Sequence, residues 1–184
     1  MICRIFGWTI AVALVLLAAT AARAQTLSLE IHLGNLETWI SNNTAVVISS
    51  DGYQISSASG ILDPVNWQSI DDSATSSPAA LSAALGSGAL SFIEVSPTSN
   101  NLTEFDLAST ATWQPGTRWS IGFPFGTSPG HFQSRPFDAR FEYTAAFGGV
   151  STGSIEFIPE PACLTFAVTA LLGIAFTRRR RLRA

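Results

Sequence analysis

The chain has 184 residues, of which 47% are hydrophobic and only 12% are charged, and its formal net charge is −3. It contains no lysine, and seven of its ten arginines lie before residue 25 or after residue 177. The 134 residues between these ends, 25–158, keep three arginines against twelve acids, a formal charge of −9. So acidic a surface argues against nucleic acid and anionic lipid as partners of the central region.

The N-terminal segment, residues 1–24, has the three parts of a secretory signal peptide. Arg4 supplies positive charge, residues 5–19 form an apolar core, and Ala22-Arg23-Ala24 fits the small-residue cleavage pattern. We therefore expect export through the Sec machinery and a mature chain that begins near Gln25. The alternative is an uncleaved N-terminal anchor, which the small residues before Gln25 disfavour.

The two cysteines lie outside the central region, Cys3 in the signal segment and Cys163 near the C-terminus. The central region therefore has no internal disulfide and must be held together by its hydrophobic core. Its 134 residues are enough for one such core. Cys163 is either an ordinary small residue of an apolar segment or a site of lipidation.

Period-two alternation of apolar and polar residues predicts strands through most of the central region, as in residues 27–33. Residues 71–78 are polar and serine-rich and predict a surface loop. Ser77, Pro78 and Gly86 delimit one short helix at 78–85. We expect tight turns at Asp51-Gly52 and Gly148-Gly149 and a hairpin connection at 41–43. The remaining predicted strands are 36–41, 44–49, 53–56, 90–95, 103–107, 118–123, 139–146 and 152–158.

This pattern of short strands and frequent turns predicts an all-β fold, a single antiparallel β-sandwich over residues 25–158. At most one short helix is expected within it. We see no internal repeat that would divide the region into smaller units.

Residues with catalytic or metal-binding chemistry are few. A set of Ser128, His131 and Asp138 has the residue types of a triad, but the sequence lacks a nucleophile-elbow pattern. The acids Asp63, Asp71 and Asp72 lack the regular spacing of a calcium loop. We therefore expect neither an enzyme, nor a cofactor, nor a metal site.

The tryptophans of the central region permit two interpretations. Their large rings suit the packed faces of strands and turns. Alternatively, they form an exposed aromatic platform that binds glycan, extended by phenylalanines near residues 123–132. The four are Trp39, Trp67, Trp113 and Trp119.

The C-terminal segment, residues 159–184, begins with Pro159-Glu160-Pro161 and continues with the uncharged run 162–177. A helix of sixteen residues is roughly 24 Å long, somewhat short of a hydrocarbon core of about 30 Å. Flanking residues extend such a span, so we predict a transmembrane helix with a cytoplasmic basic stop. The alternatives are a buried core helix and a nucleic-acid-binding tail. The stop consists of Arg178, Arg179, Arg180, Arg181 and Arg183.

This order of a Pro-Glu-Pro motif, an apolar segment and a basic terminus resembles the PEP-CTERM sorting signal of exported bacterial proteins. The resemblance implies that an exosortase-type membrane enzyme recognises the motif and removes the hydrophobic tail. It also implies an inner-membrane intermediate, followed by association with the cell surface or extracellular polysaccharide. Two functions follow as hypotheses. One is a non-enzymatic surface or extracellular-matrix protein, structural or adhesive, and the other is a carbohydrate-binding module.

Overall fold

The structure is a computed structural model that describes residues 26–106, 109–128, 136–145 and 148–159. The predicted signal segment and the predicted transmembrane segment lie outside these residues. In the described ranges, no helix has the length and hydropathy that crossing a membrane requires.

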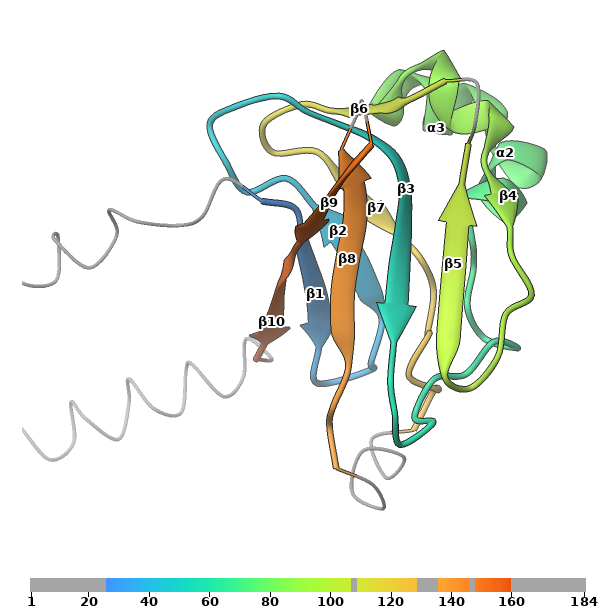
Figure 1. The fold of residues 1–184 in the computed structure, drawn as a ribbon, viewed down its shortest axis with the longest axis vertical. Helices are drawn as coiled ribbons and strands as arrows, with labels where there is room; N and C mark the ends of the chain where they lie inside the picture. Colours follow the sequence, from blue (N-terminus) through green and yellow to red (C-terminus); the bar gives the residue numbers. More distant parts are fainter. Residues whose placement is uncertain (1–25, 107–108, 129–135, 146–147, 160–184) are drawn as a thin grey trace, which may run out of the picture.

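The described chain is mostly β-sheet, as predicted, and its strands form two sheets (Figure 1). The smaller sheet has four strands in the order β10-β1-β2-β7. Its strands are β1 (Ser28–His32), β2 (Thr38–Ser41), β7 (Arg118–Ser120) and β10 (Ser154–Ile158).

The larger sheet has six strands, five of them in the order β4-β5-β3-β8-β9, and β6 pairs with the first part of β3. Its long central strand β3 contacts three neighbours and therefore holds the sheet together. The strands are β3 (Ile48–Ser56), β4 (Ile93–Glu94), β5 (Asn101–Phe105), β6 (Ala111–Trp113), β8 (Arg140–Ala145) and β9 (Gly149–Thr152).

One hydrophobic cluster lies between the two sheets, which is consistent with a β-sandwich. Leu29 and Ile31 of β1 belong to it, as do Ile55 of β3 and Phe141 of β8. The buried members all fall between Leu27 and Tyr143. The described central region therefore contains a hydrophobic core of its own.

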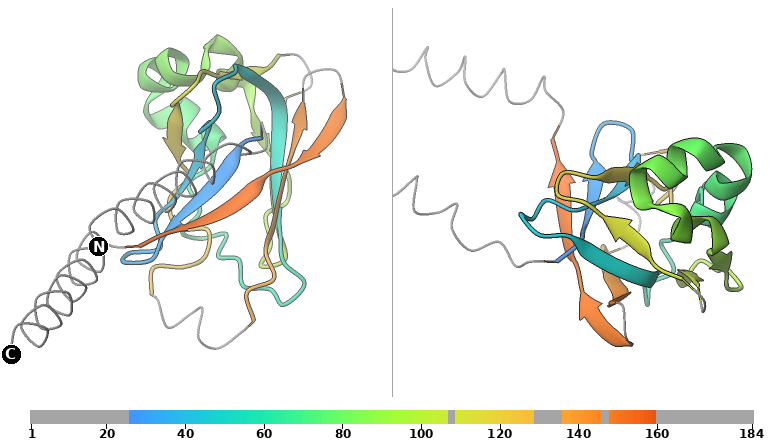
Figure 2. Two further views of the ribbon diagram at one scale, coloured as in Figure 1. Left: turned by 90° about the vertical axis from the view of Figure 1, so that its left-hand side faces the viewer. Right: turned by 90° about the horizontal axis from the view of Figure 1, so that it is seen from above.

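Two α-helices and a 3-10 helix lie together at one corner of the sheets (Figure 2). Helix α3 (Pro78–Leu85) has the bounds that the sequence predicts. Helix α2 (Ile70–Ser76) shows that the predicted polar loop at 71–78 and the limit of one helix are wrong. A 3-10 helix, η1 (Ser87–Ser91), occupies the start of the predicted strand 90–95.

The start of α2 explains this helix. Ser69 accepts a hydrogen bond from the Asp72 backbone N–H, and the Asp72 side chain accepts one from the Ser69 N–H. This reciprocal arrangement is a capping box, which satisfies backbone donors at a helix start. Ile70 and Ser73 are buried, so one side of a serine-rich segment packs on the core.

Two predicted turns are also wrong. Asp51-Gly52 lies within β3, where the pairing with β8 shifts register between Ser50 and Gly52. Residues 41–43 are not a hairpin connection, because β2 and β3 belong to different sheets. The side-chain amide of buried Asn42 donates to the carbonyl oxygens of Val46 and Trp113, at 2.8 and 2.7 Å. These bonds fix the segment by which the chain passes from one sheet to the other.

The prediction of a purely antiparallel arrangement is wrong for one strand pair, because β10 runs parallel to β1. The predicted final strand 152–158 is divided at Gly153, with β9 on one sheet and β10 on the other. A Cβ on Gly153 would lie 2.3 Å from the Phe141 ring and 2.7 Å from the Leu27 carbonyl oxygen. The absence of a side chain therefore lets the chain pass between the sheets at this point.

Candidate functional site

The outer face of the six-stranded sheet, turned away from the core, presents two adjacent rows of side chains. Strand register places the first row, here called the polar row, across β5, β3, β8 and β9. It consists of Thr103, Gln54, Glu142 and Thr152.

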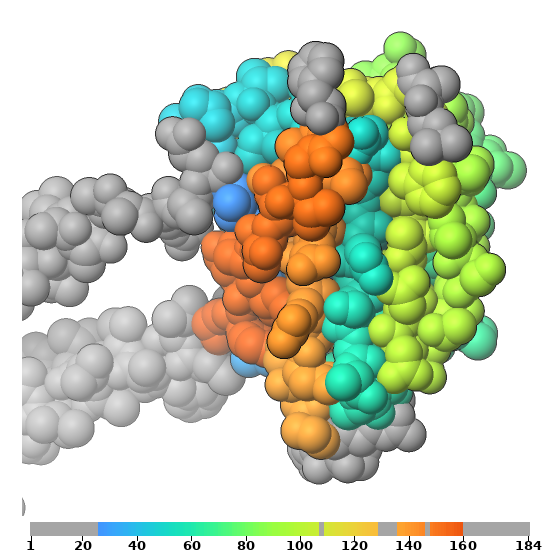
Figure 3. Space-filling model, in the orientation of Figure 1, coloured from blue at the N-terminus to red at the C-terminus, as the bar shows by residue number. Residues whose placement is uncertain are grey.

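The second row, here called the apolar row, lies two residues along each strand. It starts on β4 and crosses the same four strands, and among its members only Thr144 carries a polar side chain. It consists of Ile93, Phe105, Gly52, Thr144 and Val150. In the space-filling view, the atoms of β8, β3 and β5 form one uncovered face (Figure 3).

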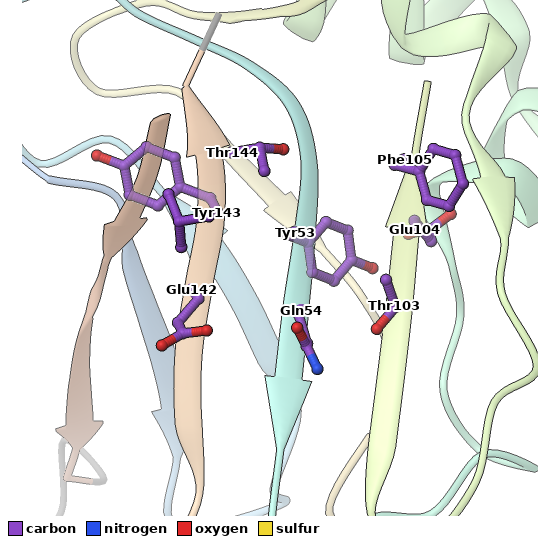
Figure 4. Close-up of a pocket in the computed structure, with 9 residues that line it drawn as sticks. Tyr53, Gln54, Thr103, Glu104, Phe105, Glu142, Tyr143 and Thr144 are labelled. Carbon is purple, nitrogen blue, oxygen red and sulfur yellow. The ribbon is translucent and has the colours of Figure 1, made fainter. Parts of the chain in front are cut away.

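A hollow of about 220 Å³ lies where the two rows meet. Figure 4 labels eight of its residues, on three neighbouring strands. Three of the lining side chains are almost inaccessible to solvent and belong to the inner face of the sheet: Tyr53, Glu104 and Tyr143. The other six residues form the side of the hollow that is open to solvent. The lining residues are Tyr53, Gln54, Thr103, Glu104, Phe105, Glu142, Tyr143, Thr144 and Val150.

Gly52 shapes this face because it stands between Phe105 and Thr144 in register and carries no side chain. A Cβ at Gly52 would lie 2.6 Å from the Glu104 carbonyl oxygen and 2.7 Å from the Phe105 Cβ. Such distances are too short for real Cβ atoms, so β5 approaches β3 closely only because residue 52 is glycine. The apolar row therefore has a position without a side chain at its centre.

Hydrogen bonds fix part of the polar row and leave other groups available. The Gln54 amide nitrogen donates to the Asn101 Oδ1 at 2.5 Å, and the Asn101 amide donates to the Thr103 hydroxyl at 2.8 Å. The Gln54 Oε1 and the Thr103 O–H then remain for a ligand. Within the described part of the chain, no hydrogen bond or ion pair engages the Glu142 carboxylate.

On the inner face, directly behind the hollow, Glu104 joins the sheet to helix α2. Its side chain is fully buried, and its two carboxyl oxygens accept the backbone N–H groups of Ile70 and Asp71 at 2.9 and 2.8 Å. The Tyr53 hydroxyl also bonds to Glu104 and accepts the Trp67 indole N–H at 3.2 Å. Burial raises the pKa of Glu104 to about 7, although these hydrogen bonds favour its charged form.

A second polar cluster lies on the outer face of the four-stranded sheet. Arg118 makes a 2.7 Å ion pair with the nearly buried Glu30, and its guanidinium lies 5.0 Å from the centre of the Trp39 ring. Asn43 and Ser41 donate to the same carboxylate at 2.7 and 2.8 Å. Burial favours neutral Glu30, but these hydrogen bonds and the Arg118 charge together hold its pKa below the usual value. The Glu30 carboxylate therefore finds its hydrogen-bond and ion-pair partners within the cluster, which is typical of a structural role.

The tryptophans do not form the exposed platform that was one interpretation of the sequence. Trp67 and Trp113 are only 5% and 1% exposed, and the Trp113 indole donates to the Ser50 hydroxyl at 2.9 Å. Trp119 packs partly against the core and donates to the Ser73 hydroxyl on α2 at 3.3 Å. Trp39 is half-buried beneath Arg118. Most of the tryptophan ring area is therefore packed in or against the core, as in the other interpretation.

The candidate catalytic and calcium sets are not assembled by the described residues. His131 lies outside them, and the Asp138 carboxylate accepts the Ser57 hydroxyl at 2.6 Å and the Ser59 N–H at 2.7 Å. Asp63 accepts hydrogen bonds from Val65 and Asn66. No three metal-ligating side chains gather within the described ranges.

The predicted sorting and cleavage residues are largely outside the described residues. Pro159 is described, exposed and directly after β10. The others are Ala22, Ala24, Gln25, Glu160, Pro161, Arg178, Arg179, Arg180, Arg181 and Arg183.

No protein-family model, curated protein or solved structure matches this chain. The hollow is therefore interpreted from its own residues. Sequence reasoning missed it because its rows depend on register between distant strands. The one local signal was the alternation of Asn101, Thr103 and Phe105 along a single strand.

Proposed function

We propose that this chain is an exported, non-enzymatic cell-surface or extracellular-matrix protein whose β-sandwich ectodomain, residues 25–158, is adhesive. The observation that carries the proposal is the hollow on the outer face of the six-stranded sheet. A concave, partly apolar site with a few converging polar groups is the usual form of a ligand-binding site. Here Gln54, Thr103 and Glu142 supply the polar groups and Phe105 and Val150 the apolar ones.

The chemistry of the hollow favours binding over catalysis. Its polar side chains facing solvent are one carboxylate, one amide and two threonine hydroxyls. Nucleophilic catalysis of the triad type requires a nucleophile within hydrogen-bond reach of a base that a third group orients. The hollow's lining includes no imidazole, thiol or amine to take part in such a set.

Delivery to the surface is the part of the proposal that rests on the two ends of the chain. A signal helix at 1–24 directs export, and the segment 159–184 acts as a PEP-CTERM sorting signal with a transmembrane helix. The exposed position of Pro159, directly after β10, supports this assignment, since the first residue of the motif is accessible to an enzyme. An exosortase-type enzyme would then have access to Pro159-Glu160-Pro161.

The test of delivery is cell fractionation with a tag placed after Gln25, in a host that contains the sorting enzyme. Wild-type protein should reach the surface without its tail. Glu160→Ala should leave an uncleaved chain in the inner membrane. Serine at residues 178–181 should let the chain slip into the periplasm, because those charges are costly to move across hydrocarbon. If both variants reach the surface at wild-type mobility, the sorting proposal is wrong.

The test of adhesion compares cells that display wild-type protein with cells that display Glu142→Gln. Loss of attachment to neighbouring cells or matrix at equal surface amount is the expected result. Glu156→Gln on β10 of the other sheet removes the same charge and serves as the matched control. Equal attachment by all three strains would contradict an adhesive role for the hollow.

A further inference from the structure

The arrangement of the two rows restricts the shape of the ligand. Both rows run across the strands, so a ligand that contacts both must present a polar edge beside an apolar face. Neighbouring strands are about 4.8 Å apart, so the four strands of the polar row provide a contact surface more than one small ring wide. The volume of about 220 Å³ is below the range of roughly 300–1,000 Å³ of sites that enclose whole drug-sized molecules. The hollow therefore suits one unit of a longer molecule.

The free hydrogen-bonding groups restrict the chemistry of that unit. The Thr103 hydroxyl accepts from Asn101 and still has its own proton to donate. Gln54 Oε1 and both Glu142 oxygens can only accept. A ligand that satisfies both kinds of group needs partners that donate and accept at neighbouring positions. Hydroxyl groups do both, whereas an ammonium group only donates.

Charge restricts the ligand further. Glu142 brings a carboxylate to the hollow in a domain of formal charge −9, so anionic ligands are repelled. Beside it, the half-buried ring of Phe105 offers an apolar surface. Sugar rings combine such an apolar face with an edge of hydroxyl groups.

We infer that the hollow binds one residue of a neutral, hydroxyl-rich saccharide. The apolar face of the sugar ring lies against Phe105, and its hydroxyls bond to Gln54, Thr103 and Glu142. The inference rests on the adhesive function proposed above and names the ligand class of the same site. It assigns saccharide binding to the six-stranded sheet and not to the tryptophans.

The experiment uses isotope-labelled protein comprising residues 25–158, which contains the whole described core. Cellohexaose, xylohexaose, mannohexaose and chitohexaose are titrated separately to millimolar concentration, and backbone amide resonances are followed. At least one hexasaccharide should shift resonances of β3, β5 and β8 while leaving those of β1, β2 and β10 unchanged. Spermidine and an uncharged Gly-Ser peptide are the probes for the competing ligand classes.

Variants connect the resonance shifts to the named side chains. Gln54→Ala and Glu142→Gln should each weaken binding by about tenfold, the usual effect of losing one or two well-placed hydrogen bonds. Val150→Ser should also weaken binding, whereas Val65→Ser should not. Val65 is the matched control because both valines are exposed, at 68% and 88% respectively, and Val65 lies outside the hollow. Thermal unfolding of each variant checks that the fold is retained.

Three results would overturn the inference. These are no shift at the hollow with any hexasaccharide, binding that Gln54→Ala and Glu142→Gln leave unchanged, and binding of spermidine or the peptide at the hollow in place of the glycans. Each can occur while the chain still reaches the surface and still promotes attachment. In that case the proposed function stands and only the saccharide assignment fails.

Discussion

At the scale of single residues, Glu104 makes the stability of the domain depend on pH. Its pKa of about 7 in the folded protein lies above the ordinary value of 4.5, so the folded state binds the proton more tightly than the unfolded chain. Its contribution to the free energy of unfolding is fully present below pH 4.5 and is lost as pH rises through 7. A shift of this size corresponds to about 3 kcal/mol.

We therefore predict that the free energy of unfolding, measured with urea, falls between pH 5 and pH 8. Glu30 has a lowered pKa and stays ionised through this window, so it does not mask the effect. Glu104→Gln should be less stable than wild type at pH 5, because one backbone N–H of α2 loses its acceptor. The variant should show a flatter pH profile. If the free energy of unfolding of Glu104→Gln depends on pH as steeply as that of wild type, the pH dependence comes from another group.

Gly153 is the second residue at which we expect a substitution to change stability, because a Cβ there would overlap the Phe141 ring. We predict that Gly153→Ala lowers the free energy of unfolding by about 2 kcal/mol or more, as overpacking of a core typically does. Gly149→Ala is the control, since a Cβ at Gly149 meets nothing within 4 Å. Equal melting temperatures for the two variants would show that the chain crosses between the sheets differently.

At the scale of elements, local signals predicted α3 well because Pro78 and Gly86 mark its two ends. The strands around 53–56 and 139–146 were also predictable from alternation. Helix α2 was missed because its serine-rich composition is typical of a loop. The capping box of Ser69 and Asp72 was visible in the sequence, but the anchoring of this helix by Glu104 depends on a residue more than thirty positions away.

The hollow was unpredictable for a related reason. Its rows join residues of β3, β5, β8 and β9 that meet only through strand register. Asp51-Gly52 also has the composition of a tight turn, yet Gly52 serves close strand approach within β3. Sequence alone cannot distinguish these two uses of the same dipeptide.

Helix α2 supplies a prediction at this scale. Ser69→Ala removes the side chain that accepts the Asp72 N–H and should lower the free energy of unfolding by about 1 kcal/mol. Amide hydrogen exchange should quicken in residues 70–76 before other regions respond. Ser76→Ala, at the exposed end of the same helix, is the matched control. Unchanged exchange in both variants would mean that the tertiary bonds to Glu104 hold the helix start without the cap.

At the scale of the whole molecule, β9 and β10 link the two sheets along one side. Phe157 of β10 packs edge-on against Phe137 at a ring separation of 5.0 Å, and Ile155 packs against the core. Removing β10 would therefore expose apolar surface and leave β1 with one unpaired edge.

We predict that a chain covering residues 25–153 is less stable than one covering 25–159, by about 2 kcal/mol or more for the lost packing of Ile155 and Phe157. Urea unfolding of the two proteins measures the difference. Light scattering should also detect self-association of the shorter chain through the uncovered edge of β1. Equal unfolding midpoints and monomeric behaviour of both would contradict an essential role for β10.

The parallel pairing of β1 and β10 has a mechanical consequence. The described chain leaves the domain at the C-terminal end of β10, where the proposed sorting would tether it, while a ligand on the six-stranded sheet would pull from the other side. A force along the axis of β10 then acts on all five register pairs with β1 at once, from Ser28–Ser154 to His32–Ile158. Bonds loaded in shear must break together, whereas bonds loaded in sequence open one at a time. An adhesive domain held in this way should resist tension at its tether, and pulling single molecules from the C-terminus should show one high-force rupture of β10.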